Sequence, residues 1–301
     1  MKTLFICLFL LTTICNAQNN TMKKTNTTDL EKLNLKGNVK SVNEFSQVLH
    51  VDDAPSIENV KTFNINGFLT NETIYYLGKE RSTEEYTYLD GKLKTKVETL
   101  LTPNGYKTTY KYAYKENDIT VEVFEDDELV ESSIKKTDEN NNIIYSKDSN
   151  LLFNTYCEKT YKYDKNDNLL LVTEDYYNED GKNYSNTINY EYEDALLIKM
   201  QHSNSISNDN VGFTEQYYYN NLNKCTKIKV FKNNELDNKQ TKVYNNGLLT
   251  EHHFYENEDE IKVIKYDYDQ KENIIKQTIN EISSVATITT IDTFEIAYYN
   301  E

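Results

Sequence analysis

The feature that most constrains this chain is a short motif that recurs along most of its length. Two aromatic residues at positions i and i+2 are followed by a polar turn and then by an apolar anchor residue. The clearest copies, residues 161–169 and 266–274, read Tyr-x-Tyr-Asp-x-x-x-Asn-Leu/Ile. Residues two apart share one face of a β-strand, and turns rich in Asn, Asp and Gly favour hairpins. The motif therefore predicts a β-hairpin.

The anchor residues recur at an average interval of about 26 residues, which is long enough for two strands, a tight turn and a return loop. Apolar residues do not recur at helical spacing over any long window. The sequence therefore predicts an all-β domain over residues 33–301. We expect tandem antiparallel β-hairpins, about nine of them, forming an elongated, twisted or curled continuous sheet. The anchors are Leu69, Leu93, Ile119, Ile143, Leu169, Leu196, Cys225, Leu248 and Ile274.

The end of the chain differs from the repeats. Residues 286–298 are rich in Thr and Ile and contain no turn. We expect them to form a long closing strand at the edge of the sheet, where an unpaired edge would be protected by the acidic charge of the chain.

The first 17 residues have the parts of a secretory signal peptide. Lys2 supplies the positive charge, and residues 4–14 are apolar but too short to span a bilayer. Cys15 and Ala17 then provide the small residues that a cleavage site before Gln18 needs. In a rival interpretation Cys15 is a lipidated N-terminus, but bulky Ile14 stands where such a site needs a small residue. We expect export to the periplasm, the cell surface or the medium. Residues 18–32 would be a flexible polar lead-in, and the mature chain would carry no transmembrane segment.

Charge and cysteine content narrow the choice of partners. The formal net charge of −16 argues against nucleic acid and anionic lipid, because both are bound through Lys and Arg. Self-repulsion at this charge also favours a monomer. Outside the leader only Cys157 and Cys225 remain. They lie about two repeats apart at different phases of the repeat, too far for a disulfide, so we expect two structural thiols.

No catalytic motif stands out. The histidines are His50, His202, His252 and His253, and the adjacent pair would face opposite sides of a strand, where the two rings cannot bind one ion. The chain lacks His-Glu-x-x-His, Cys-x-x-Cys, Gly-x-Ser-x-Gly and a glycine-rich phosphate loop. Its 49 Asp and Glu residues single out no glycosidase pair. We therefore expect no enzyme activity, no cofactor and no metal ion.

One segment has a metal-binding interpretation beside a structural one. Asp164, Asn166 and Asn168 alternate like the ligands of a calcium loop. However, Leu169 replaces the glycine that such a loop needs, and Asp175 stands where a bidentate Glu is expected. Within the repeat the same residues form a hairpin turn, which is the interpretation we favour.

The paired tyrosines are the candidate ligand-binding residues. Their rings could form a platform that stacks on sugars, or they could pack across neighbouring strands as the core of the array, which we favour. The six in the clearest pairs are Tyr161, Tyr163, Tyr190, Tyr192, Tyr266 and Tyr268.

The units at 161–169 and 266–274 resemble the YD repeat of RHS-type proteins, as found in short Bacteroidetes proteins with a signal peptide. In both units an acidic residue, Asp167 or Glu272, stands where the usual turn glycine is expected. Copies with Asn-Gly-x-Leu, at 66–69 and 246–249, also resemble the MORN-variant repeats of antitoxin-like proteins. The resemblance implies stacked hairpins, a cell-surface or secreted setting and contact with carbohydrate or protein. It implies no catalytic residues.

Taken together, these features indicate an exported, non-enzymatic binding or structural module that contacts a glycan or another envelope protein. An immunity-type protein that neutralises a basic toxin through its acidic face is an alternative. A glycan hydrolase is a second alternative, and it predicts a concave acidic pocket with two carboxylates at catalytic separation.

Overall fold

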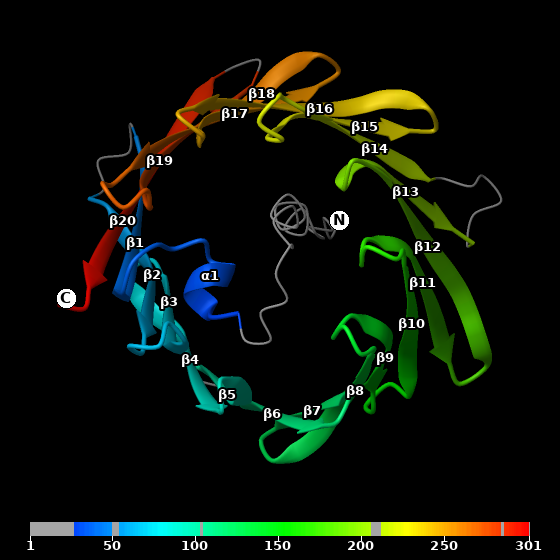
Figure 1. Cartoon of the computed structure of the whole chain (residues 1–301). Coiled ribbons are helices and arrows are strands. Elements are labelled where there is room, and N and C mark those ends of the chain that lie inside the picture. The colour runs from blue at the N-terminus through cyan, green and yellow to red at the C-terminus, as the bar shows by residue number, and fades with distance from the viewer. Residues whose placement is uncertain (1–26, 50–53, 103–104, 206–211, 284–285, 301) are drawn as a thin grey trace.

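The structure, a computed structural model, describes residues 27–49, 54–102, 105–205, 212–283 and 286–300. In this part of the chain twenty antiparallel strands form one sheet. Every strand pairs with its sequence neighbours, and β1 also pairs with β20, so the sheet closes into a barrel (Figure 1). In chain order the elements are α1 (Asp29–Lys32), β1 (Val39–Val48), β2 (Ser56–Phe63), β3 (Leu69–Tyr76), β4 (Lys79–Leu89), β5 (Lys92–Leu100), β6 (Lys107–Lys115), β7 (Asp118–Glu125), β8 (Glu128–Thr137), β9 (Ile143–Asn150), β10 (Thr155–Tyr163), β11 (Leu169–Asn178), β12 (Gly181–Glu193), β13 (Leu196–Asn204), β14 (Phe213–Tyr219), β15 (Cys225–Lys232), β16 (Glu235–Asn245), β17 (Leu248–Glu256), β18 (Asp259–Tyr268), β19 (Ile274–Ile282) and β20 (Thr287–Tyr298).

The all-β prediction is confirmed, but the predicted open, elongated sheet is wrong. The closing strand is present as β20, yet it is not an edge: it pairs with β19 and also with β1, from Val39 opposite Tyr298 to Val48 opposite Thr290. Strands twist and tilt, so a long sheet curls until its first and last strands can meet. Closure then pairs the backbone groups that an open edge would expose.

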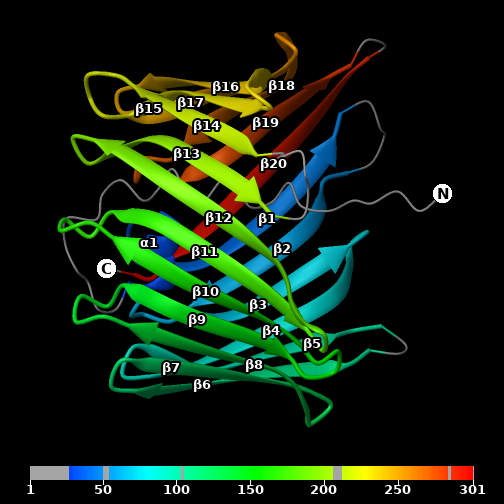
Figure 2. The same cartoon turned by 90° about the vertical axis from the view of Figure 1, so that its right-hand side faces the viewer.

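The hairpin prediction holds strand by strand. The consecutive pairs from β2–β3 to β18–β19 are the predicted hairpins, and each anchor residue is the first or second residue of an odd-numbered strand, from Leu69 in β3 to Ile274 in β19. Figure 2 shows the strands running obliquely around the barrel, with the connections gathered at its two ends. The predicted signal peptide and His50 lie outside the described residues.

The turns before the anchors share one hydrogen-bonding pattern. The Asp164 Oδ1 atom accepts hydrogen bonds from the backbone N–H of Asn166, at 2.7 Å, and of Asn168, at 2.9 Å. Asp167 takes the left-handed conformation, with φ of 64°, at the position of the missing glycine. The turn interpretation of this segment is therefore confirmed. Equivalent side chains accept the same pair of bonds in four other turns: Asn64, Asp138, Asn220 and Asp269.

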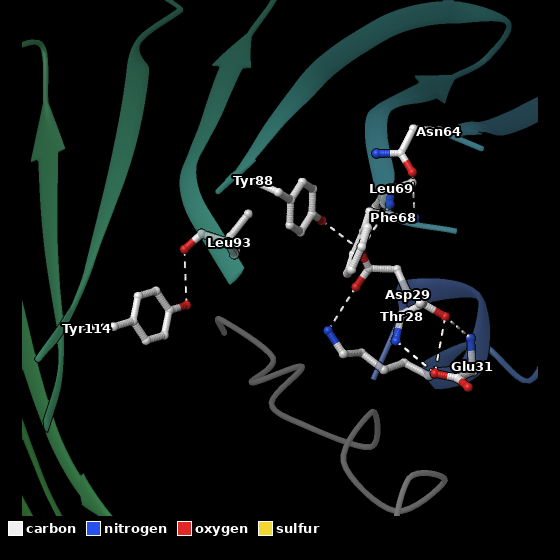
Figure 3. Close-up of polar contacts among 10 residues, drawn as sticks. Thr28, Asp29, Glu31, Asn64, Phe68, Leu69, Tyr88, Leu93 and Tyr114 are labelled. Atoms are coloured by element: carbon white, nitrogen blue, oxygen red, sulfur yellow. Dashed lines mark hydrogen bonds and ion pairs between the residues drawn. The ribbon is translucent and has the colours of Figure 1, made fainter. Parts of the chain in front are cut away.

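Helix α1 shows which face of the sheet lines the interior, because it lies inside the ring (Figure 1). The Tyr88 hydroxyl donates to Asp29 of this helix, at 2.6 Å (Figure 3). Tyr86 packs against the hydrophobic cluster that contains Leu30 of the helix, so both tyrosines of this repeat point inward. Residues directly opposite in an antiparallel pair share a face, so the strand registers carry the assignment around the barrel. The paired tyrosines of the other repeats, for example Tyr161, also point inward. We call this surface the inner wall.

In five repeats, the tyrosine that comes just before the turn ties the repeat to the one before it. Its hydroxyl donates to a backbone carbonyl at the start of the preceding odd-numbered strand, so it adds a side-chain bond between two strands that already pair through their backbones. These hydrogen bonds run from Tyr114 to Leu93 (3.0 Å), Tyr163 to Ile143 (2.9 Å), Tyr219 to Leu197 (2.7 Å), Tyr244 to Cys225 (3.0 Å) and Tyr268 to Leu249 (2.7 Å).

Residues 27–38 form a strap across the inside of the closing seam. Residues 29–32 were expected to belong to a flexible lead-in, but they form α1, whose first turn is closed by a capping box between Thr28 and Glu31. Leu30 packs against a buried cluster that includes Phe63 and Leu69.

Within the described residues, no helix has the length and apolar character needed to cross a membrane.

The seam is held at the other end of the strap by one buried amide. Asn273 is 1 % exposed; its Oδ1 accepts from the Lys36 N–H at 2.6 Å and its Nδ2 donates to the Lys36 carbonyl at 2.9 Å. The same Nδ2 lies 2.7 Å from the Tyr298 hydroxyl on β20. One side chain therefore joins the strap, the β18–β19 turn and the last strand.

Candidate functional site

A hollow with a volume of about 500 Å³ lies on the inner wall across β7 to β12, the green strands that face the viewer in Figure 2. We call it the inner-wall hollow. Along each strand the lining residues alternate in direction: every second side chain faces the hollow, and the side chains between them point outward. The inward-facing ones include Val123, Glu131, Ser133, Asp148, Asn150, Cys157, Tyr176 and Tyr184.

The hollow forms because short side chains stand next to tall ones in a single row across the strands. In this row Ser133 lies opposite Asp148, which lies opposite Cys157. Cys157 in turn lies opposite Tyr176, and Tyr176 opposite Tyr184. The two tyrosine rings stack with their centroids 4.2 Å apart and their planes 15° from parallel. The step from short residues to stacked rings gives the hollow an aromatic wall.

Two exposed carboxylates belong to the hollow. Asp148 accepts a hydrogen bond from the Ser133 hydroxyl at 2.6 Å, and Glu131 accepts one from the Asn150 amide at 3.0 Å. Each carboxylate has acceptor capacity left beside this one hydrogen bond. The hollow therefore offers acceptors to a ligand that donates hydrogen bonds.

The Tyr176 hydroxyl of the aromatic wall and the neighbouring Cys157 thiol are held in their protonated forms. The Tyr176 hydroxyl donates to Glu174 at 3.1 Å, and Glu174 pairs with Lys159 at 2.8 Å. Burial and the nearby Glu174 charge raise the pKa of Tyr176, so its hydroxyl stays protonated. Burial also raises the pKa of the Cys157 thiol, which removes the thiolate character that a nucleophile needs.

The tyrosines predicted from the sequence line the inner wall but do not line the inner-wall hollow. All six are half-buried: Tyr161 and Tyr163 lie on β10, Tyr190 and Tyr192 on β12, and Tyr266 and Tyr268 on β18. Tyr163 and Tyr268 commit their hydroxyls to the inter-repeat hydrogen bonds described above.

Sequence reasoning missed the two tyrosines that form the aromatic wall. Tyr176 is followed directly by Tyr177, and Tyr184 has no tyrosine two residues away, so neither belongs to a Tyr-x-Tyr pair. Only the register of β11 on β12 brings the two rings together.

The three histidines that the structure describes lie away from the hollow. His202 stacks on Phe213 at 4.1 Å, and burial lowers its pKa. His252 is buried next to Gln240, with 3.0 Å between Nε2 and Oε1, and burial lowers its pKa to about 3. His253 contacts Glu251 and Glu260 instead, so the prediction that the adjacent pair faces opposite sides is confirmed.

Both cysteines of the described residues are thiols in this structure, Cys157 on β10 and Cys225 on β15, with four strands between them. Within the described ranges, no group of His, Cys, Asp and Glu residues is arranged to hold a metal ion.

Comparisons with known proteins give only weak similarities. No family model matches the chain, and no curated protein matches it either. Among solved structures, a porin-like protein from Bacteroides uniformis shares 12% identity over 86% of this chain and 96% of its own, with a TM-score of 0.40. A porin-like protein from Bacteroides vulgatus shares 12% identity over 69% of this chain and 99% of its own, with a TM-score of 0.30. The TcdB2-TccC3 structure shares 14% identity over 81% of this chain and 17% of its own, with a TM-score of 0.35. Similarities of this size assign neither a family nor a function.

Proposed function

We propose that this protein is an exported, non-enzymatic module that binds a glycan in the inner-wall hollow. The proposal of export rests on the apolar leader sequence. The proposal of binding rests on one observation, the stacked Tyr176–Tyr184 wall beside the exposed carboxylates of Glu131 and Asp148.

The chemistry of the hollow suits a sugar ring. The apolar C–H face of a pyranose packs on an aromatic ring, while its hydroxyls donate to carboxylate and amide oxygens. Within the described residues every strand is paired on both sides, so a ligand has no sheet edge to extend. Recognition would therefore depend on side chains of the walls. The repeated turns and the inter-repeat tyrosine bonds support the further proposal that the chain is a YD-type repeat protein.

A binding assay with defined glycans tests this function. We expect the purified chain to bind a glycan on an array, and Tyr184→Ala to weaken that binding about tenfold in calorimetry because a stacking face is lost. Tyr218→Ala is the matched control, since Tyr218 is an exposed tyrosine of a strand outside the hollow. Equal losses in the two variants, or no binding to any glycan, would contradict the proposal.

A glycan hydrolase is the second candidate, because a hollow with two carboxylates is present. Glu131 and Asp148 are diagonal neighbours on β8 and β9, a relation that places two residues roughly 7–8 Å apart. A hydrolase would use one of them as the acid and the other as nucleophile or base, and each already accepts one hydrogen bond, from Ser133 or Asn150. Release of reducing sugar by the chain, abolished by Glu131→Gln, would favour hydrolysis over binding. The immunity-type alternative rests on net charge alone and stays a prediction.

A further inference from the structure

The proposed glycan site has an uneven charge, and this bears on which glycan it takes. Among the residues that line the inner-wall hollow, the charged ones are Glu131 and Asp148, and both are exposed. No Lys or Arg belongs to this lining. Resting on the proposed function, we infer that the hollow prefers a glycan bearing a free, protonated amine and rejects uronic acids.

The position of Asp148 gives the inference its geometry. Asp148 and Tyr176 lie in one row with only Cys157 between them. The backbones of Asp148 and Tyr176 are two strand spacings apart, roughly 10 Å. A pyranose ring that stacks on Tyr176 therefore lies over the short Cys157 side chain. A substituent on its far side points at the carboxylate of Asp148.

The neighbouring charges leave this preference in place. The next row carries Lys135 opposite Ser146, and Lys159 opposite Glu174. Lys159 is neutralised by its ion pair with Glu174. Lys135 is the cation to consider, but it lies outside the lining of the hollow. Lys147 lies on the outer face, where it pairs with Glu158 at 3.3 Å.

Three oligosaccharides of equal length separate the possibilities: oligomers of glucosamine, of N-acetylglucosamine and of galacturonic acid. Binding is measured by calorimetry at about pH 6, where an amine is protonated. We expect glucosamine oligomers to bind about twofold to fivefold tighter than the N-acetylated ones, as solvent-exposed ion pairs allow. The preference should vanish at high salt, because the two carboxylates are exposed and therefore screened.

The variants assign the preference to one carboxylate. Asp148→Asn should bring the affinity ratio of glucosamine to N-acetylglucosamine oligomers close to one. Asp175→Asn is the matched control: this carboxylate lies on β11 but pairs with Lys182 and Ser185, opposite Glu158 on the outer face. It should leave the ratio unchanged.

The outcomes distinguish this inference from the function on which it rests. If N-acetylated oligomers bind and the amine brings no gain, the inference is overturned while the glycan-binding proposal stands. Tighter binding of galacturonic acid oligomers overturns it as well and points to Lys135. If none of the oligosaccharides, nor any glycan on the array, is bound, the proposed function itself fails.

Discussion

Replacing Asn273 with alanine should loosen the closing seam of the barrel. This side chain is 1 % exposed and makes two hydrogen bonds to the backbone of Lys36 and one to the Tyr298 hydroxyl. A buried hydrogen bond contributes about 1 kcal/mol, and a buried partner left unpaired costs about 1–3 kcal/mol. We therefore expect Asn273→Ala to lower the free energy of unfolding by about 3–4 kcal/mol.

The repeat itself supplies the matched control. Asn168 occupies the same position of its motif as Asn273, and its side chain donates to Asp164 at 2.9 Å. It lies in a part-buried turn, whereas the described strap, residues 27–38, bonds to Asn273. Asn168→Ala should therefore cost only about 1 kcal/mol.

Guanidinium denaturation of the two variants and the unmutated chain measures both losses. A lower guanidinium concentration at the midpoint of unfolding, with an unchanged m-value, reports a loss of stability. A changed m-value reports a different compactness of the folded or unfolded state. Hydrogen exchange at the Lys36 amide adds a local readout of strap release. If Asn273→Ala costs no more than Asn168→Ala, and Lys36 exchange is unchanged, the reasoning about the seam is refuted.

Two further predictions concern the inner wall. Burial lowers the pKa of His252 to about 3, so the unfolded chain takes up a proton first as the pH falls. The stability present above about pH 6.5 should be lost below it, by up to about 1.4 kcal/mol per pH unit, and His252→Gln should flatten this slope in pH-dependent denaturation. Tyr163→Phe removes the hydrogen bond to the Ile143 carbonyl and should cost about 1 kcal/mol, whereas no loss would show that this bond does not stabilise the repeat.

The hairpins were predictable because their signals are local. The alternation of Tyr161 and Tyr163, the turn residue Asp164 and the anchor Leu169 act within nine residues, which one repeat can satisfy by itself. The helix was also readable in part, because Thr28 and Glu31 have the spacing of a capping box. That signal was missed because the surrounding residues are polar and lack periodicity.

The candidate site was not predictable in the same way. Tyr176 and Tyr184 belong to no repeated pair, and their stacking depends on how β11 pairs with β12. Likewise Cys157, Asp148 and Ser133 gain a shared role only because the register places them in one row. A shift by one residue would turn the opposite face of a strand inward and remove the hollow.

The sequence by itself determined the unit of this protein: a hairpin with its paired tyrosines on one face, an Asp or Asn turn and an apolar anchor. Those choices depend on backbone preferences and on contacts within about 26 residues. Tertiary structure alone decided that β20 meets β1, that the strap lies inside, and that short and tall side chains adjoin on the inner wall. These features depend on twist and register summed over the whole sheet, which no single repeat contains.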